Sequence, residues 1–302
     1  MAGELRIGIS GWRYEPWRGG FYPKGLRQAD ELAFASRQLN FNEINGTFYS
    51  LQRPSSFQTW YEATPADFCF AVKGPRFISH IKRLRDVDAP LANFFASGLL
   101  ALGEKLGPVL WQFPANFKFD AALLEAFFDL LPRSTKDAAK LAKKHDDRLK
   151  AYRALTKCKV DRPIRYAIEI RSPTFETPDF IKLLRKHRIA LVAADAAGEF
   201  PFIEDVTAAL VYLRLHGAEE LYASGYSDKD IAGWAKKIKA WSTGKEPTVA
   251  KRLAEPMKQP PKQRDVFCVF DNTMKDRAPF NAIALAGKLG LDAGEERAKK
   301  FR

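Results

Sequence analysis

The stretch Leu210–His216, which reads LVYLRLH, alternates apolar and polar side chains with a period of two. One face of this predicted strand is aliphatic, and the other carries Tyr212, Arg214 and His216. Successive side chains of a strand point to opposite sides, so in a closed barrel every second one points into the lumen. A purely structural lumen would be filled with aliphatic residues, because a buried unpaired charge is costly. The stretch therefore predicts a barrel strand with polar groups near its carboxyl end.

Similar short apolar runs recur along the chain and alternate with helical patterns, which is typical of βαβ units and a parallel sheet. The eight runs span Leu5–Ser10, Phe41–Asn45, Phe68–Lys73, Val109–Phe113, Ile164–Arg171, Ile189–Asp195, Leu210–His216 and Val266–Asn272. In a chain of 302 residues, eight such runs predict an α/β fold, a single (β/α)8 TIM-type barrel with residues 1–302 as one domain.

Two basic stretches interrupt the alternation. Residues 133–163 are expected to form a basic helical insertion between the fourth and fifth strands, with a helix from Thr135 to Ala154, and residues 244–264 a basic loop that contains Pro260-Pro261. Both precede a strand and should emerge at the amino-terminal face, where barrel residues usually serve stability. We interpret the net charge of +13 mainly as solvated surface, with a nucleic-acid-binding arm as the alternative.

Composition and local motifs narrow the class of protein. With 46% hydrophobic and 28% charged residues, the chain can bury a large core. The first predicted strand begins at Leu5, which leaves no room for an export signal, and the most apolar helical run, residues 121–131, is too short for a bilayer span. We expect a cytoplasmic protein without membrane contact whose three cysteines are reduced core thiols. Phosphate-binding glycine loops, dinucleotide fingerprints and nucleophile elbows are absent from the sequence.

Polar side chains gather where the predicted strands end. In a barrel the carboxyl ends of the strands carry the active site, so this clustering favours a ligand site over a merely hydrogen-bonded core. The set comprises Ser10, Glu43, Asn45, Lys73, Gln112, Glu169, Arg171, Asp195, Arg214, His216 and either Asp271 or Asn272.

The candidates divide by chemistry. General acid or base candidates, whose pKa the site could shift towards neutrality, are Glu43, Glu169, Asp195 and His216. Cations that could bind a small anionic ligand, or could instead form ion pairs with these carboxylates, are Lys73, Arg76, Arg171 and Arg214. Further substrate-binding candidates are the aromatic Trp12, Tyr49 and Tyr226 and the neutral polar Ser10, Asn45, Gln112 and Asn272.

A divalent metal is an open alternative to a metal-free site. Zn²⁺ or Mn²⁺ would need three or four converging ligands, and the candidates are Glu43, Glu169, Asp195, His216 and Asp271. Among the histidines only His216 is expected to supply an imidazole, because His187 lies at a predicted helix end and His80 in a basic loop. No cofactor is assigned from the sequence.

Several strand-end motifs occur together in this chain: Gly8-Ile9-Ser10-Gly11-Trp12, Glu43-Ile44-Asn45-Gly46-Thr47-Phe48-Tyr49, Lys73-Gly74-Pro75-Arg76-Phe77-Ile78-Ser79-His80, Gln112-Phe113-Pro114, Glu169-Ile170-Arg171, Asp195, Tyr212-Leu213-Arg214-Leu215-His216-Gly217 and Phe270-Asp271-Asn272. As a set they resemble the uncharacterised domain-of-unknown-function family number 72, also called YecE-like, nearly end to end. The resemblance implies a (β/α)8 barrel and no established activity. The chain departs from the family at Ser172, where His often follows Glu-Ile-Arg, and at Asp271, where many members have Asn.

Three functions fit these observations. The first is an enzyme, of hydrolase or lyase type, that acts on an anionic or phosphate-bearing substrate by acid–base or hydrolytic chemistry at the carboxyl-terminal face. The second is a nucleic-acid-binding protein, similar in fold to metal-dependent endonuclease barrels. The third is a non-catalytic module that binds a small molecule. The sequence indicates neither the substrate nor the oligomeric state.

Overall fold

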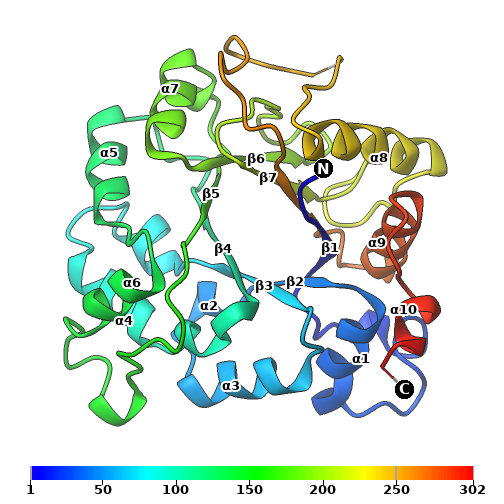
Figure 1. Cartoon of the computed structure of the whole chain (residues 1–302), viewed down its shortest axis with the longest axis horizontal. Helices are drawn as coiled ribbons and strands as arrows, with labels where there is room; N and C mark the ends of the chain where they lie inside the picture. The colour runs from blue at the N-terminus through cyan, green and yellow to red at the C-terminus, as the bar shows by residue number, and fades with distance from the viewer. Residues whose placement is uncertain (1, 249, 302) are drawn as a thin grey trace. The chain divides into compact units, whose positions relative to one another are not determined.

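The computed structural model describes residues 2–248 and 250–301. Within them, eight strands follow one another in chain order around a closed barrel (Figure 1). Their bounds are β1 Leu5–Ser10, β2 Phe41–Ile44, β3 Cys69–Lys73, β4 Leu106–Gln112, β5 Tyr166–Glu169, β6 Ala190–Asp195, β7 Leu210–Leu215 and β8 Asp265–Phe270. The pairs β1–β2, β1–β8, β3–β4, β4–β5, β6–β7 and β7–β8 are parallel. The prediction of a (β/α)8 barrel is confirmed.

Helices connect the strands. The α-helices of the described residues are α1 Glu31–Gln38, α2 Gly46–Tyr49, α3 Pro54–Ala63, α4 Asp88–Ala96, α5 Ala121–Leu130, α6 Thr135–Ala142, α7 Pro178–His187, α8 Asp228–Ser242, α9 Arg277–Lys288 and α10 Glu295–Lys299. Shorter helical turns lie at Glu15–Trp17, Gln28–Asp30, Phe77–Ile81, Leu99–Lys105, Ala151–Arg153 and Pro173–Phe175. In this part of the chain, no helix is both long enough and apolar enough to cross a membrane.

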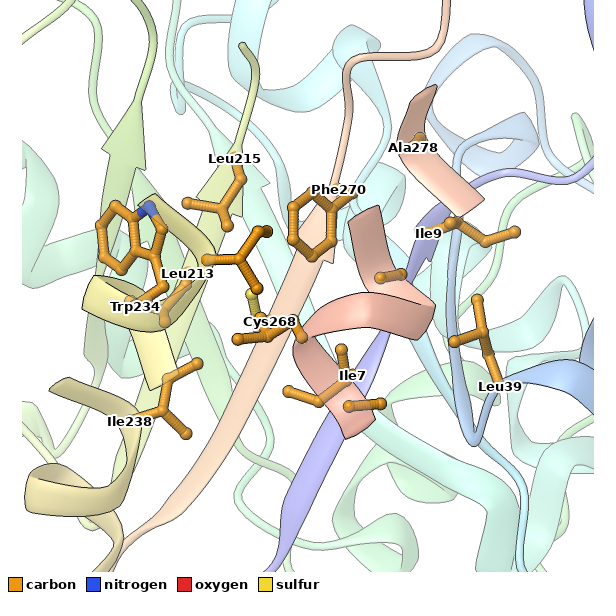
Figure 2. Close-up of a cluster of buried hydrophobic side chains, with 14 of the residues drawn as sticks. Ile7, Ile9, Leu39, Leu213, Leu215, Trp234, Ile238, Cys268, Phe270 and Ala278 are labelled. Atoms are coloured by element: carbon orange, nitrogen blue, oxygen red, sulfur yellow. The ribbon is translucent and has the colours of Figure 1, made fainter. Parts of the chain in front are cut away.

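The chain folds into two compact units. The first unit comprises Met1–Glu43 and Glu176–Arg302, and the second unit comprises Ile44–Phe175. The core of the first unit lies between its strands and the helices α8 and α9, as Figure 2 shows. The residues labelled there are Ile7, Ile9, Leu39, Leu213, Leu215, Trp234, Ile238, Cys268, Phe270 and Ala278. Leu213 and Leu215 thus occupy the apolar face that the alternation in β7 predicts.

The core of the second unit is built around the indole of Trp111 in β4. The rings of Phe94 in α4 and Phe127 in α5 lie 5.7 and 5.2 Å from it, centroid to centroid. All three side chains are almost completely buried. Edge-to-face packing of this kind adds to the free energy gained from burying the rings.

The expected helix from Thr135 to Ala154 is wrong beyond Ala142, where α6 ends. A longer helix would bond the backbone N–H of Asp146 to the carbonyl of Ala142. Instead, that N–H donates to the Asn93 side-chain oxygen at 3.0 Å, and the Asn93 amide donates to the Asp146 carboxylate at 2.8 Å. A contact with α4 therefore overrides the local helical pattern, which is only a weak preference.

Two helices begin at caps formed by neighbouring residues in the sequence. The Thr177 side chain accepts a hydrogen bond from the Asp179 backbone at the start of α7, where Pro178 occupies the first turn. At the start of α8, Ser227 and Asp230 form a reciprocal capping box. Such caps satisfy backbone N–H groups that the first helical turn leaves without partners.

Candidate functional site

The first unit buries a group of charged side chains at the ends of β1, β2 and β7. Register places Ser10 of β1 beside Glu43, which directly precedes Ile44 at the end of β2. The Glu43 carboxylate accepts hydrogen bonds from the Ser10 hydroxyl at 3.0 Å, the Tyr212 hydroxyl at 2.7 Å and the Arg214 guanidinium at 2.8 Å. All four residues are fully buried. Hydrogen bonds to ionised groups are stronger than neutral ones, so this group fixes the Glu43 side chain.

Asp271 extends this group toward His216. Its Oδ2 atom lies 2.9 Å from the Arg214 guanidinium and 3.0 Å from His216 Nδ1. Arg214 therefore contacts two carboxylates, Glu43 and Asp271, as in the ion-pair alternative for this residue. A carboxylate beside one imidazole nitrogen orients the ring, which is the arrangement used by general acid–base histidines.

Asp195 and Tyr226 lie beside this histidine. The His216 backbone N–H donates to the Asp195 carbonyl at 2.8 Å. Burial raises the pKa of Asp195, while the hydrogen bond from Tyr226 and the nearby His216 oppose that rise. The Tyr226 hydroxyl also accepts from the Gly217 backbone at 3.1 Å. The first unit thus brings together three of its predicted site residues, Asp195, His216 and Tyr226.

The second unit holds a buried carboxylate at the ends of β4 and β5. Register pairs Gln112 with Glu169, and the Gln112 amide donates to both Glu169 carboxylate oxygens, at 3.0 and 2.9 Å. The Arg171 guanidinium donates to Glu169 Oε1 at 3.2 Å. Glu169 is fully buried, whereas the Arg171 side chain is 20% exposed. The Glu169 carboxylate is therefore held in place and partly neutralised by Arg171.

Cations surround His80 in the same unit. Lys73, at the end of β3, is 8% exposed, and its Nζ lies 4.5 Å from the centroid of the Phe48 ring. The His80 ring packs edge-on against Phe48 at 5.1 Å, and its Nδ1 lies 2.9 Å from the Ser79 hydroxyl. Burial first, then the charges of Lys73, Arg171 and Arg76, lower the pKa of His80 to about 4.

The remaining predicted site residues have other surroundings. Trp12 is buried, and its carbonyl accepts from the Tyr22 hydroxyl at 2.6 Å. Asn45 precedes α2, and its carbonyl accepts from the Phe48 backbone. Tyr49 is 71% exposed. The Asn272 amide donates to the Ser224 carbonyl at 3.0 Å and the Asn281 side chain at 3.1 Å, so it fastens a loop to α9.

Three residues join these groups although the sequence did not place them among the catalytic or substrate-binding candidates. Tyr212 lies on the same face of its strand as Arg214, which was a usable signal. Asp271 was named among the strand-end polar residues and as a possible metal ligand, but not as a catalytic or substrate-binding residue. His80 was interpreted as part of a basic loop, because nothing in the local pattern reveals that Phe77–Ile81 forms a helical turn.

The described residues contain no group of three or more His, Cys, Asp or Glu side chains arranged to hold a metal ion. The carboxylate oxygens of Glu43 and Glu169 instead accept hydrogen bonds from Ser, Tyr, Arg and Gln side chains.

The fold and these strand-end groups define a (β/α)8 barrel protein with buried ionisable side chains in both units. Residues 6–300 match the model of the family described as protein of unknown function DUF72, and the chain belongs to this family. Escherichia coli YecE is 33% identical over 129 residues, which cover 42% of this chain and 44% of YecE, so the match spans less than half of that relative.

Two solved structures share the fold. A DUF72 family protein from Thermotoga maritima has a TM-score of 0.69 and 23% identity, covering 95% of this chain and 99% of the other. A DUF72 family protein from Enterococcus faecalis has a TM-score of 0.67 and 18% identity, covering 95% of this chain and 96% of the other. The family places the chain among proteins whose function is unknown.

Proposed function

We propose that this protein is an enzyme that binds a small phosphate-bearing anion and acts on it by acid–base chemistry of the hydrolase or lyase type. The observation that carries the proposal is the convergence of three cations on His80 in the second unit. Lys73, Arg76 and Arg171 act on His80 together with one carboxylate, Glu169. Cations that converge on a partly buried ring create a local positive potential, which favours binding of an anion.

Proton transfer would use His80 and Glu169. The lowered pKa keeps His80 neutral at neutral pH, so the ring is able to accept a proton. An anion bound among the cations would offset their charge and raise the pKa of His80, which would make it a better base when substrate is bound. The hydrogen bonds from Gln112 and Arg171 hold the Glu169 carboxylate in one orientation.

The first unit offers its own candidates for proton transfer, Asp195 and His216. Burial raises the pKa of Asp195 towards neutral pH. Asp271 lies beside His216 Nδ1 at 3.0 Å. Arg214 takes no part in the proposed anion site, because its guanidinium already pairs with Glu43 and Asp271.

Binding of inorganic phosphate, measured by isothermal titration calorimetry, tests the anion site. Lys73→Met keeps most of the side-chain volume but removes the charge, and we expect it to weaken phosphate binding at least tenfold. Lys136→Met removes an exposed charge on α6 in the same unit and should leave the affinity unchanged. Equal affinities for the wild type and Lys73→Met would contradict the proposed anion site.

Turnover of a panel of phosphate monoesters and diesters tests the chemistry. Glu169→Gln keeps the shape of the side chain and removes its charge, so we expect phosphate to bind at least as tightly while turnover is lost. Phosphate binding without turnover of any ester by the wild type would favour the non-catalytic binding module instead.

A further inference from the structure

The second unit contains a small apolar cavity of about 200 Å³ next to the cations around His80. Residues that follow β2 and β3 form most of its wall, and the basic insertion adds one cation. The lining used in the argument below comprises Phe48, Tyr49, Leu51, Phe77, Ile78 and Arg148. Phe48 and Phe77 follow the carboxyl ends of strands, and Arg148 lines the same cavity. The expectation that the whole insertion lies at the amino-terminal face is therefore wrong for Arg148.

Two aromatic side chains of this wall are open to solvent. Tyr49 is 71% exposed and Phe77 is 37% exposed, although both lie beside the buried Phe48 and Ile78. Single exposed apolar residues are common, but aromatic rings grouped around a hollow are typical of ligand sites. The cavity therefore offers an apolar surface that a ligand could cover.

Phe48 connects this cavity to the positive charges. Its ring lines the cavity, while Lys73 Nζ lies 4.5 Å from its centroid and the His80 ring lies 5.1 Å away. The Arg148 guanidinium lies 5.7 Å from the ring of Phe77, which also lines the cavity. A ligand with its apolar part in the cavity would thus have its negative group within reach of cations.

The size of the cavity limits the apolar part to one ring system. Pockets for drug-sized ligands usually measure about 300–1,000 Å³, and this one is smaller. A flat ring suits the edge-to-face arrangement that Phe48 and Tyr49 already adopt, with centroids 5.1 Å apart, and it can also stack beneath the Arg148 guanidinium.

We propose that this cavity binds the aromatic ring of the substrate, whose phosphate group contacts Lys73 and Arg76. The ligand class is therefore an aromatic ring that carries a phosphate. This inference rests on the proposed anion site and adds the part of the substrate that distinguishes one phosphate ester from another.

Calorimetric titrations with methyl, cyclohexyl and phenyl phosphate test the inference, because the three esters share one charged group. We expect phenyl phosphate to bind about tenfold more tightly than methyl phosphate, as burial of one ring allows. Phe77→Ala and, independently, Tyr49→Ala should remove this advantage and leave methyl phosphate binding unchanged. Ile81→Ala is the matched control, since Ile81 is 59% exposed and belongs to the same helical turn but does not line the cavity.

The outcomes separate the inference from the proposed function. Equal binding of methyl and phenyl phosphate would overturn the aromatic cavity and leave the anion site standing. Cyclohexyl phosphate binding as tightly as phenyl phosphate would overturn the aromatic class of ligand. Failure of all three esters to bind would overturn the anion site and, with it, this inference. If Ile81→Ala also bound phenyl phosphate no more tightly than methyl phosphate, the cavity would not be the source of the tighter binding of phenyl phosphate.

Discussion

Glu43 shows at the scale of single residues how a buried carboxylate is held by hydrogen bonds inside the first unit. The Tyr212 hydroxyl donates to it at 2.7 Å, and both side chains are fully buried. The Tyr166 hydroxyl in the second unit makes a comparable bond, at 2.5 Å, to the neutral Pro132 carbonyl. The two tyrosines therefore form a matched pair that differs in the charge of the acceptor.

Replacing Tyr212 with Phe should lower the free energy of unfolding by about 1.5–3 kcal/mol, because the lost hydrogen bond goes to a charged group. Tyr166→Phe should lower it by about 1 kcal/mol, the usual value for a neutral acceptor. Urea unfolding monitored by circular dichroism measures both values. An equal or smaller loss in Tyr212→Phe would mean that the hydrogen bond to Glu43 is no stronger than the bond to the neutral Pro132 carbonyl.

The His80 imidazole is the residue whose titration reports most directly on the surrounding cations. Its pKa in the folded chain is about 4, against an ordinary value of 6.5. The unfolded chain therefore takes up this proton first as the pH falls, so His80 makes the folded state lose stability between about pH 6.5 and pH 4. Above pH 6.5 the ring is neutral in both states and this loss is absent.

Removing one cation should move this pKa upward. We expect Arg76→Met, which changes an exposed residue, to raise the pKa of His80 and to reduce the loss of stability between pH 6.5 and 4. Nuclear magnetic resonance titration of the His80 ring protons measures the shift directly, and added phosphate should shift the pKa in the same direction. An unchanged midpoint in both experiments would show that burial alone lowers this pKa.

Helix α8 illustrates an element whose start is set by local sequence. Ser227 accepts from the Asp230 backbone at 3.2 Å, and the Asp230 carboxylate accepts from the Ser227 backbone at 2.9 Å. Ser227→Ala removes the first bond and should cost about 1 kcal/mol of stability, whereas Ser227→Thr should keep most of it. Chemical denaturation of the two variants checks this. A Thr variant as destabilised as the Ala variant would mean that the hydroxyl does not cap α8.

Elements of this kind could be predicted because their signals are local. The two-residue period of β7 depends on neighbours in the chain, and the structure reproduces it. The caps of α7 and α8 are local in the same way. The end of α6 could not be predicted, because it depends on Asn93, 53 residues away. Likewise, the sequence placed Arg214 and Glu43 at strand ends, but their ion pair joins residues 171 apart and required the folded structure.

The residues of the candidate site divide in the same way, into strand residues that could be predicted and loop residues that could not. The strand-end residues Glu43, Glu169 and Asp195 lie where the alternation predicts, since register follows from the barrel itself. His80 and Arg148 lie outside the strands, and their positions depend on how loops fold. A pattern with a period of two carries no information about such loops, so the cavity beside Phe48 could not be anticipated.

At the scale of the whole molecule, the net charge of +13 raises the nucleic-acid alternative again. Many of the cations already have partners: Arg264 pairs with Glu246, Lys237 with Glu204, and Lys140 with Asp137. Such pairs reduce the positive field available to a polyanion. The basic insertion nevertheless carries Lys136, Lys143 and Lys144 as exposed side chains, which makes it the natural place to test for binding of nucleic acid.

Binding of a fluorescently labelled single-stranded oligonucleotide, followed by anisotropy at several salt concentrations, distinguishes surface charge from a specific site. If the insertion binds phosphates only through its surface charge, the triple variant Lys136→Gln, Lys143→Gln and Lys144→Gln should bind with a weaker salt dependence. The slope of log affinity against log salt should fall by about 2, because each phosphate that is no longer neutralised contributes about 0.7. Lys73→Met should then change oligonucleotide binding little, while it weakens binding of small phosphates at least tenfold. The opposite pattern, in which Lys73→Met abolishes oligonucleotide binding and the triple variant does not, would identify a nucleic-acid strand as the ligand of the cations around His80. In that case a base would be the aromatic ring to test in the cavity beside Phe48, because bases stack on aromatic side chains in the same way as other flat rings.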